Sequence, residues 1–246
     1  MTTRIVFIGA ESTGKSALAT QVAERFGGTA TCTAAVQDGE LADPGQVVTR
    51  IQAPERVVLM GERLALNLLM KLSGIATHTR AWTRAAEGSD LRVVDTRKTT
   101  PLLRALEKAA VRHGGGHNHR MGLYDGVMIK DNHIAAVGGI GPAVARVRAA
   151  VHHLVKVEVE VTTLDELDQA LAAGADVLLL DNMSDDELAA CVARARATRP
   201  EVLLEASGNM DAARIGRIKD IGLDLVSAGG LIHQARWVDL SLRFDG

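Results

Sequence analysis

Aromatic residues make up only 2% of this 246-residue sequence, so few rings are available to stack on the bases of single-stranded nucleic acid. The formal net charge is only -2, which gives no long-range attraction to nucleic acid or to an anionic membrane. The two cysteines, Cys32 and Cys191, lie far apart and lack a CxxC partner, which argues against a disulfide scaffold and a zinc site. No apolar run has the length of a transmembrane helix or the pattern of a secretion signal. We therefore expect a cytoplasmic protein with no nucleic-acid or membrane partner.

Apolar residues, by contrast, are plentiful. They make up 47% of the sequence, which is enough to bury a sizeable core and excludes intrinsic disorder for most of the chain. Six short β-rich runs alternate with helical stretches: LRVVD (91–95), DGVMIK (125–130), LVKVEVEV (154–161), ADVLLLD (175–181), EVLLEA (201–206) and LDLVSAG (223–229). Continuous Val, Ile and Leu strands are buried on both faces, so this βα repeat predicts a parallel sheet, as a barrel or a doubly wound sheet.

The chain divides into two predicted parts. The segment 33–60 is a small β-rich piece with turn signals, and 62–87 has the apolar stripe of a long helix. We predict an α/β protein with a small N-terminal α/β domain over 1–74 and an incomplete βα barrel over 75–227. The tail 228–246 is expected to pack on the N-terminal domain.

Two helix starts carry the pattern of a capping box. Thr163 is followed three residues later by Glu166, and Ser184 is followed in the same way by Glu187. In each pair the hydroxyl and the carboxylate satisfy backbone amides of the first turn. These pairs predict helices that begin directly after Thr163 and Ser184.

Polar residues recur at the carboxyl end of every predicted strand: Asp95 with Arg97 and Lys98, Lys130, Glu160, Asp181, Glu205 with Ser207 and Gly208, and Ser227 with Gly229. A single charge at a strand end is usually just solvated. In a βα barrel, however, these ends converge on one mouth, where active sites lie. Cations together with carboxylates suit an anionic substrate accompanied by a divalent metal or by sugar hydroxyls.

The segment 114–133 adds a glycine-rich turn, three histidines and an arginine around one strand. His117, His119 and His133 are candidate metal ligands, but their spacing matches no standard zinc pattern and the neighbouring Arg120 disfavours a cation. Anion recognition is the better interpretation, in which Arg120 grips a carboxylate bidentately and His119 donates a further hydrogen bond.

These residues also carry a family resemblance. The segment DTRKTTPLLRALEKAAVRHGGGHNHRMGLYDGVMIKDNHI (95–134), together with GERLALNLL, LSGIATHTR, VEVEV, LLLDNMS, LLEASG and AGGLIH, resembles the quinolinate phosphoribosyltransferases. The resemblance runs from about Val36 to Arg243. It implies a pentosyltransferase, a carboxylating nicotinate-nucleotide diphosphorylase of NAD biosynthesis. The reaction joins quinolinate to the phosphoribosyl group of phosphoribosyl pyrophosphate and yields nicotinate mononucleotide, pyrophosphate and CO2.

The resemblance also implies roles for individual residues. Quinolinate carboxylates would be held by Thr96, Arg97, His119 and Arg120, and by Arg63 from the neighbouring subunit of a homodimer. Lys98 and Lys130 would face the substrate carboxylate and the pyrophosphate. Glu160 and Asp181 would bind ribose hydroxyls or the Mg²⁺ carried by the pyrophosphate. The 5-phosphate would be held by Ser207, Gly208, Asn209, Ala228, Gly229 and Gly230. Carboxylates near the anomeric carbon suit this chemistry, because the transfer develops oxocarbenium character there.

Three positions depart from the family pattern. Leu102 stands where the family usually has glycine, and Asn209 and Gly230 replace the commoner glycine and alanine. None of these changes removes a charged contact. Leu102 lies in the loop beside Arg97. We therefore expect this departure to change the affinity for the substrate rather than the type of reaction.

The N-terminus offers a competing interpretation. The segment 5–27 is a strand, a GxxxxGKS loop and a helix, and Gly9, Gly14, Lys15 and Ser16 have the Walker A spacing that cradles phosphates. It resembles the start of a P-loop kinase, so a nucleotide-binding protein or kinase is the alternative function. A P-loop domain needs a parallel sheet of its own, however, and the phosphoribosyltransferase pattern has begun by about Val36. A remnant without complete ATPase chemistry is the favoured hypothesis.

Overall fold

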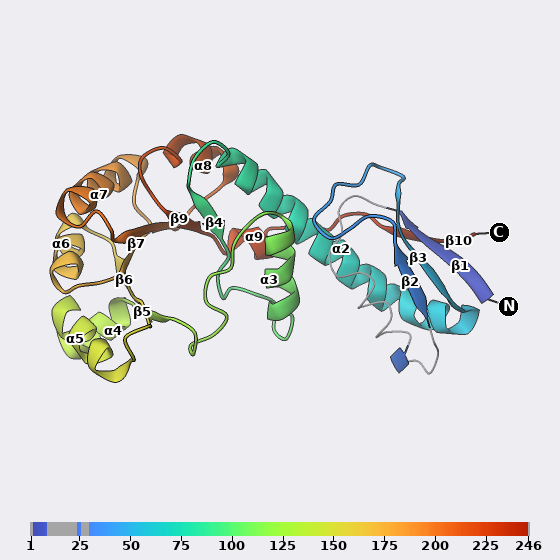
Figure 1. The fold of residues 1–246 in the computed structure, drawn as a ribbon, viewed down its shortest axis with the longest axis horizontal. Helices are drawn as coiled ribbons and strands as arrows, with labels where there is room; N and C mark the ends of the chain where they lie inside the picture. Colours follow the sequence, from blue (N-terminus) through green and yellow to red (C-terminus); the bar gives the residue numbers. More distant parts are fainter. Residues whose placement is uncertain (1, 9–23, 26–29, 246) are drawn as a thin grey trace. The chain divides into compact units, whose positions relative to one another are not determined.

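The structure is a computed structural model that describes residues 2–8, 24–25 and 30–245. The chain forms two compact units, which interleave along the sequence (Figure 1). The first unit contains residues 1–81, 99–116 and 231–246, and the second contains 82–98 and 117–230. Among the described helices, none combines the length and apolarity needed to cross a bilayer.

The first unit is built on an antiparallel sheet. Its strands are β1 (Thr2–Ile8), β2 (Thr31–Ala34), β3 (Val47–Pro54) and β10 (Ser241–Asp245), in the order β10-β1-β3-β2. Strand β1 pairs antiparallel on both sides, so that Ile5 stands opposite Phe244 on one side and Ile51 on the other. The C-terminal strand therefore completes the N-terminal sheet.

Two helices accompany this sheet, α2 (Glu55–Ala85) and α3 (Arg104–His113). The apolar stripe of α2 is buried at Leu66, Leu69, Leu72 and Ile75, as the helical periodicity predicts. A core cluster joins the helix to the sheet: Val36, Ala42, Val48, Ile51, Ala53, Val58, Leu66, Leu69 and Leu240. Gly74 lies on the same helix, and a Cβ there would stand 2.1 Å from the carbonyl oxygen of Arg236. The close approach of the C-terminal segment therefore requires glycine at this position.

This topology corrects the P-loop interpretation. A P-loop strand sits in a parallel sheet and leads into the phosphate loop, whereas β1 lies in an antiparallel sheet between β3 and β10. The four Walker-type residues, Gly9, Gly14, Lys15 and Ser16, lie outside the described residues. The sheet that contains β1 is therefore not the parallel sheet that a P-loop nucleotide-binding site requires.

The second unit is built on a six-stranded parallel sheet. Its strands are β4 (Arg92–Val94), β5 (Val127–Ile129), β6 (Val157–Val161), β7 (Val177–Asp181), β8 (Leu203–Ser207) and β9 (Leu225–Ser227). Their order is β4-β9-β8-β7-β6-β5, and each described neighbouring pair is parallel. Within the described chain β4 and β5 are the two edges of this sheet. The predicted α/β class with an incomplete barrel is confirmed.

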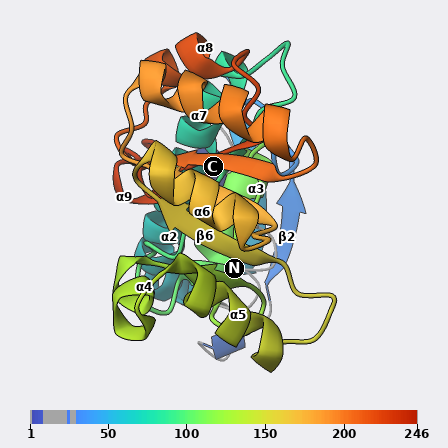
Figure 2. The same cartoon turned by 90° about the vertical axis from the view of Figure 1, so that its left-hand side faces the viewer.

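Helices follow the strands of this sheet: α4 (Asp131–Val137), α5 (Ile140–Ala150), α6 (Leu164–Ala172), α7 (Asp185–Thr198), α8 (Ala212–Ile218) and the short α9 (Gly230–His233). Figure 2 shows α6 in front of β6, with α5 and α7 on either side. In β6 the alternate residues Val157, Val159 and Val161 are fully buried. Because side chains alternate along a strand, Glu158 and Glu160 project from the opposite face.

The predicted helix starts are found in slightly different forms. Ser184 and Glu187 make the full capping box: Glu187 N donates to Ser184 Oγ and Ser184 N donates to Glu187 Oε2. Thr163 Oγ1 accepts from Glu166 N, but the Glu166 carboxylate accepts from Thr162 N and its hydroxyl. The helix after Thr163 therefore begins where predicted, but the Glu166 carboxylate accepts its hydrogen bonds from Thr162 and not from the amide of Thr163.

Candidate active site

The strand register of the second unit collects polar side chains on one face of the sheet. Glu160 of β6 stands opposite Leu179 of β7, and Leu179 lies two residues before Asp181 on the same strand. Asp181 in turn stands opposite Ser207 of β8. Residues two apart on a strand share a face, so Glu160, Asp181 and Ser207 project from the same side.

Lys130 follows β5 and forms an ion pair with Glu160, through Nζ and Oε2. The Glu160 carboxylate is 13% exposed and the Lys130 side chain 43% exposed, so the pair lies at the boundary between interior and solvent. The backbone of Lys130 is fixed as well, because its amide donates to His133 Nδ1 at 2.9 Å at the start of α4. Two of the predicted catalytic residues are therefore in direct contact.

The turns after β7 and β8 lie against each other. Asn182 has a left-handed φ of 56°, and its amide donates to the carbonyl of Ser207 at 3.2 Å. Its side-chain amide donates to Asp181 Oδ2 at 2.7 Å. Gly208 has a φ of 110°, and a Cβ there would stand 2.4 Å from Asn182 Oδ1. Only glycine therefore fits at 208, while Asn209 beside it is exposed.

Asp95 ties β4 to the segment that carries the histidines. It is fully buried, and its two oxygens accept from the amide of His119 at 2.9 Å and from Asn118 Nδ2 at 2.5 Å. The following loop turns on Thr96, whose hydroxyl accepts from the amide of Lys98 at 3.0 Å. Arg97 and Lys98 are exposed on that loop. Asp95 is thus an internal anchor rather than a solvent-facing strand end.

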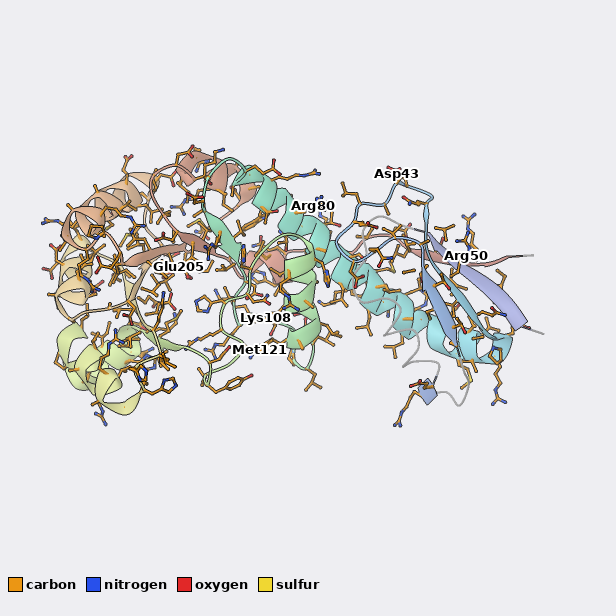
Figure 3. The ribbon with its side chains drawn as sticks, in the orientation of Figure 1. Asp43, Arg50, Arg80, Lys108, Met121 and Glu205 are labelled. Carbon is orange, nitrogen blue, oxygen red and sulfur yellow. The ribbon has the colours of Figure 1, made fainter. Side chains whose placement is uncertain are left out.

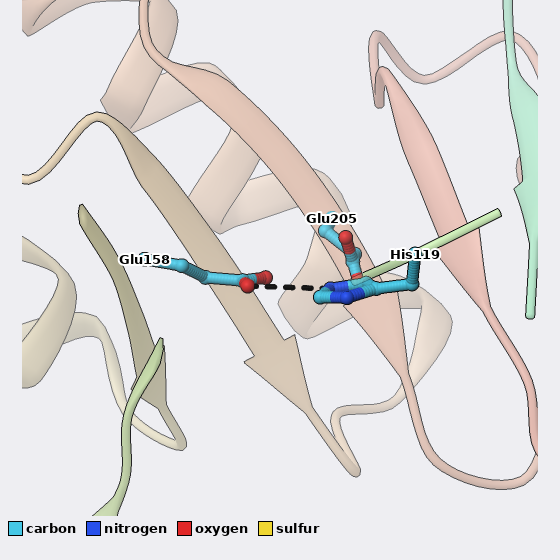
Figure 4. Close-up of side chains that lie close together, drawn as sticks. All are labelled: His119, Glu158 and Glu205. Carbon is cyan, nitrogen blue, oxygen red and sulfur yellow. Dashed lines mark ion pairs between the residues drawn. The ribbon is translucent and has the colours of Figure 1, made fainter. Parts of the chain in front are cut away.

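His119 lies between two buried glutamates (Figure 4). Its Nε2 is 3.3 Å from Glu158 Oε2 on β6 and 3.7 Å from Glu205 Oε1 on β8. Its Nδ1 accepts a hydrogen bond of 2.7 Å from the amide of Arg120. Both ring nitrogens of His119 are therefore engaged with the protein.

Burial shapes the charges of this cluster. Burial, together with repulsion from Glu158, raises the pKa of Glu205 to about 7, despite the opposing effects of His119 and of a hydrogen bond with Ser227. Burial alone would lower the pKa of His119. The hydrogen bond with Glu158 and the charges of Glu205 and Glu158 outweigh it, so the pKa is raised. Glu205 is therefore only partly ionised near neutral pH.

Arg120 stands beside this cluster. Its Nη1 donates to the carbonyl of Gly126 at 2.9 Å, which fixes the guanidinium against the loop before β5. Burial and the charge of Arg97 lower the pKa of Arg120, which places the two guanidinium groups within electrostatic reach of each other. Two neighbouring guanidinium groups suit a ligand that carries two carboxylates.

A pocket of about 510 Å³ opens on this face of the sheet; its lining includes Asn118, His119, Arg120, Met121, Asp125, Lys156, Glu158 and Glu205. Figure 3 labels Glu205 on β8 and Met121 on the loop after His119. Of the predicted site residues, His119 and Arg120 line this pocket. Glu160, Asp181 and Ser207 belong to the same unit and the same face of the sheet but not to this lining.

Sequence reasoning missed Glu158 as a site residue. The available signal was the alternation in VEVEV, because Glu158 must share a face with Glu160 when the valines face the helices. It also treated Glu205 as a strand end, although Glu205 is the middle residue of β8 and only 2% exposed.

The three-histidine metal interpretation is not supported in the part of the chain that the structure describes. The cluster of potential ligands that forms there is His119 with Glu158 and Glu205, whose donor atoms lie within 4.8 Å of one another. His133 Nδ1 instead accepts the amide of Lys130. Because Nδ1 of His119 accepts a hydrogen bond, a neutral ring carries its proton on Nε2, and that nitrogen is then unsuited to bind a metal.

Two predicted site residues, Ala228 and Arg63, do not line this pocket. The amide of Ala228 donates to the carbonyl of Val94 at 3.1 Å, so it is committed to the sheet. Gly229 and Gly230 follow it at the start of α9, and the role of this turn in binding phosphate stays a prediction. Arg63 is an exposed residue of α2 in the first unit.

Two domain models of one protein family match this chain. The model of the quinolinate phosphoribosyl transferase C-terminal domain matches residues 75–243, and the model of the N-terminal domain matches residues 2–73. The N-terminal match takes in the whole Walker-type segment, which replaces the P-loop-kinase interpretation.

Individual relatives cover most of the chain. A probable carboxylating nicotinate-nucleotide pyrophosphorylase from Bacillus subtilis is 45% identical over 206 residues, which are 84% of this chain and 70% of that protein. The human carboxylating nicotinate-nucleotide pyrophosphorylase is 39% identical over 84% of this chain and 70% of its own. The solved structure of the Francisella tularensis nicotinate-nucleotide pyrophosphorylase superposes with a TM-score of 0.91 at 36% identity, over 100% of this chain and 87% of that one.

Proposed function

The chain belongs to the quinolinate phosphoribosyl transferase family, with carboxylating nicotinate-nucleotide pyrophosphorylase activity in NAD biosynthesis, and we propose that the second unit houses the reaction. The phosphoribosyl group of phosphoribosyl pyrophosphate moves to the ring nitrogen of quinolinate, and pyrophosphate and CO2 leave. The observation that carries this proposal is the shared face of the parallel sheet, where His119 and Arg120 line a pocket and Lys130, Glu160 and Asp181 project from the same side.

Quinolinate is the anion to be recognised first. In the proposal, Arg97 and Arg120 bind its two carboxylates, because planar guanidinium groups match carboxylates bidentately. His119 contributes to the same carboxylate site, with Thr96 shaping the loop that carries Arg97. Lys98, exposed on that loop, faces the substrate carboxylate. The charge of Arg97 lowers the pKa of Arg120, and this interaction between the two guanidinium groups supports the assignment.

The ribosyl transfer takes place at the carboxyl ends of the strands. The bond from the anomeric carbon to the pyrophosphate oxygen breaks, and a bond from that carbon to the ring nitrogen forms. Glu160 and Asp181 stabilise the positive charge that develops on the sugar, and Lys130 faces the leaving pyrophosphate. Loss of the carboxylate next to the ring nitrogen is then eased, because the nitrogen carries positive charge after transfer.

The 5-phosphate is assigned to the turns after β8 and β9. Ser207, Gly208, Asn209, Gly229 and Gly230 are proposed to hold it. The absence of a side chain at 208 lets the backbone run close to Asn182, and the same property permits a close approach to phosphate. Ala228 is left out because its amide bonds to Val94.

Mg²⁺ is the proposed metal, and the donors fit it. Glu160 and Asp181 are carboxylates on one face, both only partly buried, and hard cations prefer oxygen ligands. Mg²⁺ bound with phosphoribosyl pyrophosphate would neutralise charge on the departing pyrophosphate.

A homodimer is the proposed assembly, with Arg63 reaching the partner's site. Arg63 is exposed on α2, and the neighbouring Leu59, Met60 and Leu64 are 52%, 50% and 53% exposed. Apolar side chains that expose half of their surface beside a functional arginine indicate an interface. We place the protein in the cytoplasm, in keeping with a cysteine content too low for a disulfide scaffold.

The test is a direct assay of the full chain with quinolinate, phosphoribosyl pyrophosphate and Mg²⁺. We expect nicotinate mononucleotide, pyrophosphate and CO2 in equal amounts, with the CO2 released from the carboxylate beside the ring nitrogen. Nicotinate, which lacks that carboxylate, serves as the control substrate and should react far more slowly. Failure to form the mononucleotide, or equal turnover of nicotinate, would refute the proposed function.

A further inference from the structure

Two buried glutamates remain without a role in the proposed reaction. Glu158 and Glu205 project into the pocket from β6 and β8, and are only 6% and 2% exposed. Buried carboxylates are costly unless an opposite charge or hydrogen bonds compensate them. They also line the pocket that is proposed to receive a dianion. Their presence there requires an explanation.

We propose that Glu158 and Glu205 are positioning residues that act on quinolinate through His119, whose imidazole covers their charge and faces the substrate in their place. The inference rests on the proposed function and deepens it. It changes the role of His119 from a separate hydrogen-bond donor to the substrate into one member of a hydrogen-bonded cluster.

Hydrogen bonds fix the imidazole in this orientation. Its Nδ1 accepts the amide of Arg120 at 2.7 Å, so in the neutral ring the proton lies on Nε2, which is 3.3 Å from Glu158. The backbone amide of His119 is held by the buried Asp95. A flip of the ring would break the contacts at both nitrogens. The Nε2–H group therefore points toward the glutamates rather than toward a ligand.

The carboxylates in turn depend on the imidazole. Among the described residues, Glu158 Oε1 and Glu205 Oε1 have no hydrogen-bond partner, and the latter lies 3.7 Å from His119 Nε2. The guanidinium of Arg120 is another positive group that interacts with Glu158. Above neutral pH, where Glu205 is ionised, removal of the imidazole would therefore leave two poorly compensated carboxylates facing the anionic substrate, which would repel it.

This arrangement makes an unusual prediction for a double variant. His119→Ala should weaken quinolinate binding, because the loss exposes the glutamates. Glu205→Gln keeps the size of the side chain and removes its charge, so it should restore binding when added to His119→Ala. If His119 were only a direct donor, Glu205→Gln would restore nothing in that background.

The experiment is a calorimetric titration of the folded full-length protein with quinolinate, together with steady-state kinetics. We expect His119→Ala to raise the Kd for quinolinate by about tenfold or more. The Kd of the double variant should be at least about threefold lower than that of His119→Ala. The turnover number should change less than the Michaelis constant, because the cluster does not touch the reacting atoms. Glu201→Gln, at an exposed glutamate outside the pocket, is the matched control and should leave the Kd unchanged. If His119→Ala does not fold, His119→Gln replaces it with the same expectation.

The outcomes separate this inference from the proposed function. Rescue in the Kd supports the cluster, whether or not the wild type forms nicotinate mononucleotide; absence of that product refutes only the proposed reaction. A double variant that binds no better than His119→Ala overturns the inference. So does a wild type whose quinolinate binding depends on an added divalent metal and is lost in Glu205→Gln, because a metal would then occupy the cluster.

Discussion

Lys130 and Glu160 form an ion pair at the carboxyl ends of two neighbouring parallel strands. In the proposed reaction these two side chains serve different groups, since the lysine faces pyrophosphate and the glutamate faces the sugar or Mg²⁺. The pair would therefore keep these two proposed substrate-binding groups in place before the substrate arrives.

Glu160→Gln should affect phosphoribosyl pyrophosphate much more than quinolinate. Loss of the carboxylate removes stabilisation of the developing sugar charge and releases Lys130, so we expect kcat to fall by about a hundredfold. The Kd for quinolinate should change by less than about threefold. Steady-state kinetics and calorimetry measure both values. Asp168→Asn removes another paired carboxylate, on α6, and is the control. A Glu160→Gln enzyme with normal turnover would remove Glu160 from the site.

Arg97→Ala should raise the Michaelis constant for quinolinate by about tenfold or more, because a carboxylate loses a charged, bidentate partner. Arg97→Lys should restore little, since an ammonium group lacks the guanidinium fork. Kinetics at saturating phosphoribosyl pyrophosphate measure the effect. An unchanged Michaelis constant in Arg97→Ala would contradict the assignment.

The proposed sharing of the site across a homodimer predicts complementation between two inactive variants. Arg63→Ala spoils the contribution to the partner's site, and Asp181→Asn spoils the site of its own chain. In a mixed dimer one site has both residues intact, so equal mixing after subunit exchange should give roughly a quarter of the wild-type activity. Each variant alone is the control. A mixture no more active than its components would show that Arg63 does not act across the interface.

The fold was largely predictable because the periodicity of the sequence is strong. Five of the six parallel strands fall within the predicted runs, and β8 extends one residue beyond its run to Ser207. The stripe through Leu69 and Ile75 identifies the long helix. The start of that helix was predicted at 62, whereas α2 begins at Glu55. The sequence VVLM at 57–60 is apolar and begins with two β-branched valines, so it suits a strand as well as a helix. The predicted boundaries 1–74 and 75–227 remain a prediction.

The site was predictable in its residue types but not in its contacts. Strand ends point to Glu160 and Asp181, because convergence follows from parallel topology. The direction of the His119 ring depends on a hydrogen bond with the amide of Arg120, and no pattern in the sequence encodes it. The commitment of the Ala228 amide to Val94 likewise depends on pairing between distant segments.

Glu205 should make the stability of the protein depend on pH. Its pKa is raised in the folded protein to about 7 from an ordinary value of 4.5, so between these values the folded state binds more protons than the unfolded state. The stabilisation that this provides is present below pH 4.5 and is lost as the pH rises through 7. Glu205→Gln should therefore be relatively more stable at pH 8 than at pH 5, by on the order of 2 to 3 kcal/mol. Urea unfolding of both proteins at the two pH values measures this difference, and equal pH dependence would contradict it.

Leu102 occupies a position that suits glycine. Its φ is 67°, in the left-handed region, and its side chain is 101% exposed, so no buried contact offsets the strain. Leu102→Gly should therefore stabilise the protein by about 0.5–1 kcal/mol, after the extra chain entropy of glycine is subtracted. Leu154→Gly is the matched control: Leu154 is 77% exposed in a loop and is not among the residues with positive φ, so the same change should destabilise. Urea unfolding at one pH compares the three proteins, and a Leu102→Gly variant as destabilised as Leu154→Gly would show that the left-handed backbone at 102 carries no strain.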